Sequence, residues 1–206
     1  MRSVLKCDKH MRAYRDPSTL DEAYYAELGL LDGGKLRATK HVDELAEALG
    51  PFPEPTGNGL ALEIGCGVSP YCLAMQDAGW VYRGMDLSDW AIGWMIDQYD
   101  VEAYSGDWES GVWPFSSFIL AAHCLEHMRD SPKALKKMAD SLLPGGHLWL
   151  IVPDDGDPTN PDHLWFFTEA TLDIAIFRAG LVLNKIVTYQ RVPHEKFIYA
   201  RAKKPF

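Results

Sequence analysis

The sequence predicts an α/β fold built on a doubly wound, mostly parallel sheet that ends in an antiparallel C-terminal strand. From residue 58 onward, short apolar segments alternate with helical stretches, which is typical of strand–helix–strand units. The segment 118–124 is apolar on both faces, as a central parallel strand must be. Only a short turn containing Pro193 separates the last two apolar segments, which indicates an antiparallel pair.

The N-terminal part, residues 1–57, ends in the Pro- and Gly-rich segment 50–59, which favours neither helix nor strand. Two helices are predicted before it, around Leu20–Leu28 and over Leu36–Leu49. Apolar residues at three- and four-residue spacing form one stripe on the second helix, at Val42, Leu45, Ala46 and Leu49. Because this part is too short to bury a core of its own, we expect it to cover a main domain of residues 58–206.

The first half of the main domain contains three predicted strands and two predicted helices. The strands are the apolar segments 60–64, 80–86 and 101–105. The helices lie between them, over Tyr71–Ala78 and from Ser88 to about Ile96. Gly79 is expected to end the first helix, and the Ser88 hydroxyl to cap the second.

Four more predicted strands bring the sheet to seven, at residues 118–124, 147–152, 181–189 and 196–202. Ser131 is the predicted N-cap of a helix that has a proline in its first turn. This helix is expected to stop at Pro144-Gly145-Gly146, just before the fifth strand. Thr168 can cap a last helix that runs to Arg178.

Composition narrows the class of protein. The 206 residues carry 20 Lys and Arg against 29 Asp and Glu, a net charge of −9, which disfavours nucleic acid or an anionic membrane as a partner. The sequence shows neither a membrane-spanning run nor a signal-peptide core, so we expect a cytoplasmic protein. The cysteines, Cys7, Cys66, Cys72 and Cys124, form no CxxC pair, so we expect reduced thiols and no metal site.

The sharpest motif is Leu62–Pro70, which directly follows the first strand and opens a helix. Gly65 and Gly67 allow a tight turn and the close approach of a ligand, at the edge where open α/β sheets bind nucleotide-like molecules. A dinucleotide loop would need a third glycine, whereas Val-Ser-Pro follows here. Glu63 would repel a phosphate but suits a cationic amine.

Acidic residues follow the next two strands. Asp86 ends the second strand, 19 positions after Gly67, where an acid can accept hydrogen bonds from both ribose hydroxyls. Asp107 follows the third strand and can accept from an adenine amino group, while Trp108 can pack on the adenine ring. Adenosine with an amino-acid tail and no phosphate fits this order.

At these residues the chain resembles the class I S-adenosylmethionine-dependent methyltransferases, in particular their small-molecule branch. The matching motifs, between about residues 58 and 202, are Glu63-Ile64-Gly65-Cys66-Gly67, Asp86, Gly106-Asp107, Leu125-Glu126-His127, Leu143-Pro144-Gly145-Gly146 and the segment His163–Thr168. The sequence departs from the family pattern at Ser69, where many members have a third glycine, and at Ser116-Ser117-Phe118, where Phe-Asp is usual. A third departure is Asp140-Ser141-Leu142-Leu143, which lacks the common Arg-Val-Leu. None of these removes an expected cofactor contact.

The resemblance implies a Rossmann-like fold that binds S-adenosyl-L-methionine and releases S-adenosyl-L-homocysteine. The expected cofactor-binding residues are Glu63, Gly65, Cys66, Gly67, Asp86, Leu87, Asp107, Trp108 and His123. The implied reaction is an in-line methyl transfer to a small-molecule acceptor, in which alignment matters most and a base is optional. Neither the acceptor nor the oligomeric state is encoded in these motifs.

Several residues are candidates for the acceptor side. His163, on the long segment 153–167, and His127, after the fourth strand, are the candidate catalytic bases, with His123 as a third. We expect His163→Ala to lower turnover more than His127→Ala. A lid is expected from the N-terminal residues Tyr14, Tyr24, Tyr25 and Arg37. The acidic run Asp154, Asp155, Asp157 and Asp162 is interpreted as a solvated loop, with attraction of an amine as the alternative.

Three other functions stay open. The first is an RNA or protein methyltransferase. The sequence lacks an Asn/Asp-Pro-Pro-Tyr motif after the fourth strand and lacks a basic face, which argues against methylation of a base amine. A non-catalytic methyltransferase-like subunit would not need the intact cofactor motifs. An NAD-linked oxidoreductase is disfavoured by Glu63 and the missing third glycine.

Overall fold

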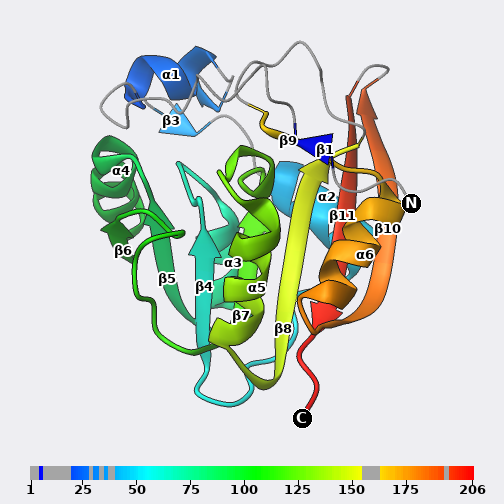
Figure 1. The fold of residues 1–206 in the computed structure, drawn as a ribbon. Coiled ribbons are helices and arrows are strands. Elements are labelled where there is room, and N and C mark those ends of the chain that lie inside the picture. The colour runs from blue at the N-terminus through cyan, green and yellow to red at the C-terminus, as the bar shows by residue number, and fades with distance from the viewer. Residues whose placement is uncertain are drawn as a thin grey trace.

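The computed structural model describes residues 5–6, 20–27, 30–32, 35–36, 40–154, 163–192 and 195–206. Its centre is a seven-stranded sheet with the strand order β10-β11-β8-β7-β4-β5-β6 (Figure 1). The strands are β4 (Leu60–Ile64), β5 (Val81–Asp86), β6 (Glu102–Ser105), β7 (Ser116–Ala122), β8 (Leu142–Pro153), β10 (Val182–Val192) and β11 (Glu195–Lys203). Neighbours from β6 to β8 are parallel, and β11 is antiparallel to both β8 and β10. The predicted fold class is confirmed.

Helices cover both faces of the sheet and give a three-layer arrangement (Figure 1). Their bounds are α2 (Lys40–Leu49), α3 (Tyr71–Asp77), α4 (Asp89–Tyr99), α5 (Ser131–Ser141) and α6 (Glu169–Arg178). Apolar residues of α5 and α6 pack on one face, and those of α2, α3 and α4 pack on the other. None of the helices in the described ranges is long and apolar enough to cross a membrane.

The central strand β7 explains why both faces are apolar. Phe118 and Leu120 join the cluster beneath α2 and α3, whereas Ile119 and Ala121 join the cluster beneath α5 and α6. Because successive side chains of a strand point to opposite faces, a strand between two helix layers must be apolar at every position. All four of these side chains are fully buried, which anchors the middle of the sheet.

The N-terminal elements differ in part from the prediction. The predicted helix around Leu20–Leu28 is α1 (Glu22–Glu27), and the one predicted over Leu36–Leu49 begins only at Lys40. Short antiparallel strands precede it, β2 (Leu31–Asp32) and β3 (Lys35–Leu36), and β1 (Leu5–Lys6) pairs with β9 (Trp165–Phe166). Leu45 and Leu49 of α2 are buried in the same cluster as the sheet, so α2 is part of the main core.

Three predicted boundaries were wrong for local reasons. The N-cap of α5 is Asp130, whose carboxylate accepts from the Lys133 N–H at 3.1 Å, and Ser131 is already helical. Helix α4 continues to Tyr99, because Asp100 adopts the left-handed conformation that ends it. Strand β8 begins at Leu142, before Pro-Gly-Gly, because an irregularity in its pairing with β7 accommodates the extra residues.

The cysteines that the structure describes follow the prediction. Cys66, Cys72 and Cys124 are buried free thiols. Cys7 lies outside the described residues. Burial raises the pKa of the Cys66 and Cys124 thiols well above its usual range, so neither thiol is activated as a nucleophile.

Candidate functional site

The candidate site lies where the strand order reverses. Strands β5 and β7 flank β4 on opposite sides, so the loops after them diverge and leave a crevice at their carboxyl ends. A cavity of about 300 Å³ opens there. All nine residues expected to bind the cofactor line it: Glu63, Gly65, Cys66, Gly67, Asp86, Leu87, Asp107, Trp108 and His123.

The loop after β4 needs glycine at two positions. Gly65 and Gly67 have φ angles of +68° and +50°, in the left-handed region that glycine adopts without strain. A Cβ on Gly65 would lie 2.6 Å from the Cβ of Cys124, closer than two carbons can pack. A Cβ on Gly67 would lie 3.2 Å from the Tyr25 ring. The absence of a Cβ at these two glycines therefore lets the loop pack closely against Cys124, after β7, and against Tyr25 of α1.

Glu63 supplies a buried carboxylate beside this loop. Its side chain is 1% exposed, and Oε2 accepts a hydrogen bond of 2.7 Å from the Tyr82 hydroxyl. Burial raises the pKa of Glu63 to about 7, although hydrogen bonds from Ser69 and Tyr82 oppose the shift. A cation bound in the cavity would stabilise the ionised form of this carboxylate.

Asp86 is held at the end of β5 by backbone donors. The Gly67 N–H donates to Oδ2 and the Ser88 N–H to Oδ1, each at 2.9 Å. Burial raises the pKa of Asp86, and these bonds, with one from the Tyr25 hydroxyl, oppose it. A carboxylate has about four acceptor positions, and the Leu87 N–H is a further donor to Asp86, so a ligand hydroxyl would take the place of the Tyr25 hydroxyl.

Asp107 organises the turn after β6 as well as lining the cavity. Its Oδ1 accepts from the Glu109 N–H at 2.9 Å, and Oδ2 accepts from the Ser110 hydroxyl and pairs with Arg129. Trp108 lines the cavity but is largely buried, with its indole N–H donating to the Ala134 carbonyl at 3.3 Å. The turn role of Asp107 is thus visible, and its contact with adenine stays a prediction.

Tryptophans other than Trp108 pack outside the lining. Trp90 stacks on Tyr25, Trp94 packs edge-on against Tyr99, and Trp113 stacks on Trp108.

Helix α1 lies over the cavity at the same end of the sheet (Figure 1). Tyr24 and Tyr25 both line the cavity, and the Tyr25 ring stacks on Trp90 at 5.5 Å. The Ser88 hydroxyl donates to the Leu20 carbonyl and so ties this segment to the start of α4. The other two expected lid residues, Tyr14 and Arg37, lie outside the residues whose side chains the structure describes.

His123 has an unusual backbone directly after β7. Its φ angle is +54°, and its N–H donates to the Ile151 carbonyl at 2.9 Å. Its ring packs edge-on against Phe197 at 4.8 Å. A left-handed non-glycine residue carries strain of about 1–2 kcal/mol, so this turn is held by the packing around it.

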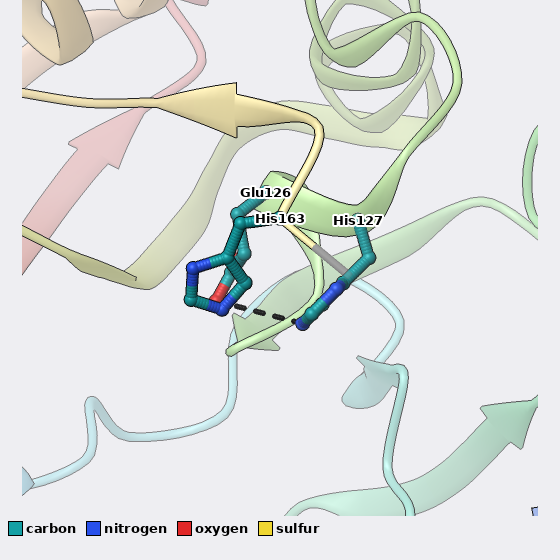
Figure 2. A group of neighbouring side chains, drawn as sticks. All are labelled: Glu126, His127 and His163. Carbon is teal, nitrogen blue, oxygen red and sulfur yellow. Dashed lines mark ion pairs between the residues drawn. The ribbon is translucent and has the colours of Figure 1, made fainter. Parts of the chain in front are cut away.

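The other two candidate histidines meet although they are far apart in sequence. His127 belongs to a short 3-10 helix, Leu125–His127, and lines the cavity. His163 is 7% exposed, and the described part of the cavity lining does not include it. The two rings lie 5.0 Å apart, with Glu126 beside them (Figure 2). Burial raises the pKa of the Glu126 carboxyl, and the nearby His127 partly opposes this rise.

Sequence reasoning missed this grouping. The sequence indicates Glu126 only as part of a family motif, and His127 and His163 lie 36 positions apart. A backbone hydrogen bond of 2.8 Å from the Leu164 N–H to the Glu126 carbonyl brings the two segments together. Of the acidic run, only Asp154 is described: it is partly exposed and its N–H donates to the Lys196 carbonyl, while Asp155, Asp157 and Asp162 lie outside the described residues.

Comparisons with known proteins bear on the family. A family model described as a methyltransferase domain matches residues 36–186, more than half of the chain. No curated protein matches the chain.

Solved structures share the fold. The N-methyltransferase NodS from Bradyrhizobium japonicum WM9, in complex with S-adenosyl-L-homocysteine, has a TM-score of 0.70 at 20% identity, covering 90% of this chain and 100% of that one. Magnesium protoporphyrin IX methyltransferase (ChlM) from Synechocystis PCC 6803, with bound SAH, has a TM-score of 0.70 at 13% identity, covering 90% and 96%. The [4+2]-cyclase SpnF has a TM-score of 0.65 at 16% identity, covering 81% and 80%. At these identities the likeness shows the fold.

Proposed function

This chain belongs to the methyltransferase domain family, and we propose that it transfers the methyl group of S-adenosyl-L-methionine to a small-molecule acceptor. The observation that carries the proposal is the position of Glu63, a buried carboxylate that lines the cavity beside the glycine loop. An anion at this point favours a ligand with an amine and disfavours a pyrophosphate. The family match supports the same cofactor.

The lining residues fit the parts of this cofactor. We assign the amino group to Glu63, because its carboxylate has no cation partner among the hydrogen bonds that hold it. We assign the ribose to Asp86, where a ligand hydroxyl can take the place of the Tyr25 hydroxyl. The adenine is assigned to Asp107 and Trp108, and the chain between amine and ribose to Gly65.

A small acceptor fits a cavity that α1 partly covers. Tyr24 and Tyr25 of this helix line the cavity. The net charge of −9 disfavours RNA. One structure of similar fold is, by its name, a methyltransferase of magnesium protoporphyrin IX, which is a small organic molecule. We propose that the N-terminal part with α1 covers the cavity, whereas α2 belongs to the core of the main domain.

The chain contributes mainly alignment and exclusion of water. When bound, S-adenosyl-L-methionine would supply a sulfonium methyl group that an acceptor oxygen, nitrogen, sulfur or carbon can attack, with S-adenosyl-L-homocysteine as the leaving group. Tyr25, stacked on Trp90 above Gly67, shields the cavity from solvent. Where the acceptor carries a proton, His127 and His163 are the proposed bases, and His127 is the one that lines the cavity.

Calorimetry with S-adenosyl-L-homocysteine and NAD tests the cofactor. We expect one equivalent of S-adenosyl-L-homocysteine to bind and NAD not to bind. Heat from NAD with none from S-adenosyl-L-homocysteine would refute the proposal. Labelled S-adenosyl-L-methionine with a panel of amines, phenols, sugars and carboxylates then tests transfer. Cofactor binding without transfer to any acceptor would favour a non-catalytic subunit.

A further inference from the structure

Three side chains beside the cavity form a compact cluster of possible metal ligands: Glu126, His127 and His163. Each offers one donor atom, and the three donor atoms lie within 4.8 Å of one another. Figure 2 shows the two imidazoles and the carboxylate converging from separate parts of the chain. Glu126 and His127 belong to the 3-10 helix after β7, whereas His163 belongs to the segment that leads into β9.

The buried carboxylate of Glu126 is a position that a cation would stabilise. Its side chain is 1% exposed, and neither oxygen accepts a hydrogen bond from another residue that the structure describes. His123 Nδ1 and His127 Nε2 each lie 3.9 Å from Oε1, which is too far for a hydrogen bond. A buried carboxylate without hydrogen bonds is costly unless a cation pairs with it.

We propose that Glu126, His127 and His163 bind a divalent transition-metal ion. Two imidazole nitrogens and one carboxylate oxygen are the protein ligands of many catalytic zinc sites and of mononuclear iron sites. Imidazole favours such metals over magnesium or calcium. Donor atoms around a tetrahedral ion lie about 3.4 Å apart at zinc–nitrogen distances near 2.0–2.1 Å, so the cluster must contract. The His127 side chain is 36% exposed and is therefore the least constrained of the three ligands.

Two hydrogen bonds hold the backbone of Glu126 and that of the segment after His163 together. The Leu164 N–H donates to the Glu126 carbonyl at 2.8 Å, and the Trp165 indole N–H donates to the Met128 carbonyl at 2.6 Å. These bonds clamp the residues after His163 onto the 3-10 helix, so the ligands are held by rigid backbone. The family match does not depend on the metal, and metal binding does not depend on the proposed methyl transfer.

The position of the ion follows from His127, which belongs both to the cluster and to the cavity lining. A bound ion therefore lies at the edge of the cavity. With three protein ligands, a coordination position is left for water or for an oxygen or nitrogen of a small molecule. In that case the metal would hold the acceptor, and the two histidines would act as ligands rather than as free bases.

Cobalt and zinc titrations of the full chain test the proposal after treatment with a chelator. Absorption of bound Co²⁺ reports its stoichiometry and geometry, and competition with Zn²⁺ gives the zinc affinity. We expect one equivalent to bind. His163→Ala and Glu126→Gln should each raise the dissociation constant more than about tenfold, since losing even an outer-shell partner costs 10- to 100-fold. His147→Ala, a half-buried histidine on β8 away from the cluster, is the matched control and should bind like the wild type.

Calorimetry with S-adenosyl-L-homocysteine on the same preparations separates the two proposals. Retained binding shows that a variant is folded, and if Glu126→Gln does not fold, His127→Ala replaces it. Absence of stoichiometric Co²⁺ binding to the wild type would overturn the metal site. So would binding that is unchanged in His163→Ala and His127→Ala. If the wild type binds Co²⁺ but does not bind S-adenosyl-L-homocysteine, only the cofactor proposal is overturned.

Discussion

The protonation of Glu63 should couple cofactor binding to pH. Without a ligand, burial raises the pKa of Glu63 from 4.5 to about 7. A pKa that is raised in the folded state adds stability at low pH, and this stability is lost as the pH rises from about 4.5 to about 7. At 1.36 kcal/mol per pKa unit, ionising this carboxyl in the free protein costs about 3 kcal/mol of folding free energy.

A ligand ammonium beside Glu63 reverses this cost, because it stabilises the carboxylate. If only the ionised form binds, a pKa of about 7 makes the dissociation constant roughly fifteenfold larger at pH 5.5 than at pH 7.0. A ligand α-amino group stays protonated over this range, since its pKa is about 8 or above. Calorimetry with S-adenosyl-L-homocysteine in buffers of different ionisation enthalpy measures both the affinity and the proton released.

Glu63→Gln is the matched control, because its amide oxygen can still accept from the Tyr82 hydroxyl. The variant should unfold at higher urea than the wild type near pH 8 and bind S-adenosyl-L-homocysteine more weakly. Any pH dependence that it retains belongs to groups other than Glu63. The reasoning is refuted if the affinity of the wild type changes no more between pH 5.5 and 7.0 than that of Glu63→Gln.

Three further predictions use other parts of the cavity. Asp86→Ala should weaken S-adenosyl-L-homocysteine binding by about 2–3 kcal/mol. Asp107→Ala should weaken it by only about 1–2 kcal/mol, because the Asp107 carboxylate also accepts hydrogen bonds within its own turn, from Glu109 and Ser110. Calorimetry that finds both variants unchanged would contradict the placement of adenosine. Gly65→Ala should lower the free energy of unfolding by about 2–4 kcal/mol, since its Cβ meets Cys124 at a positive φ. Gly93→Ala is the control, since Gly93 lies on the exposed face of α4 and an added Cβ would meet nothing. This variant should raise the free energy of unfolding by up to about 1 kcal/mol. Equal urea midpoints for Gly65→Ala and Gly93→Ala would argue against the clash at Gly65. Tyr25→Ala removes the ring stacked on Trp90 and should speed the release of S-adenosyl-L-homocysteine by about 2- to 10-fold in stopped flow. An unchanged rate would mean that α1 does not cover the bound ligand.

The sequence predicted the sheet well because the signals for it are local. Strand β4 and the glycine loop after it are contiguous, and an apolar run such as 118–124 has few other structures open to it in an α/β chain. The carboxyl ends of parallel strands share one edge of the sheet. Residues at the ends of β4, β5, β6 and β7 or just after them were therefore expected to meet, and all nine of them line one cavity.

Features that depend on competition between neighbours could not be predicted in the same way. Asp130 and Ser131 are both good N-caps, and only the path of the chain out of the 3-10 helix decides that Asp130 is used. The pairing of β8 with β7 at Leu142 depends on an irregular register that no local pattern indicates. The meeting of His127 with His163 depends on β9 folding back on the 3-10 helix, a contact set by tertiary structure.

Cys124 connects the cofactor loop to the histidine cluster. Its Cβ limits the space above Gly65 on one side, and on the other side the 3-10 helix with Glu126 and His127 begins directly after it. His123, immediately before it, has a left-handed backbone held by a hydrogen bond to Ile151. A ligand that shifts the glycine loop therefore pushes on the turn at His123 and Cys124. This turn has little freedom to adjust, and a close-packed interior passes such a displacement on to its neighbours. We expect occupancy of the cofactor pocket to influence the cluster of Glu126, His127 and His163 through this turn. The metal affinity should then differ between the free and the S-adenosyl-L-homocysteine-bound protein. By linkage, the metal ion must change the affinity for S-adenosyl-L-homocysteine by the same factor.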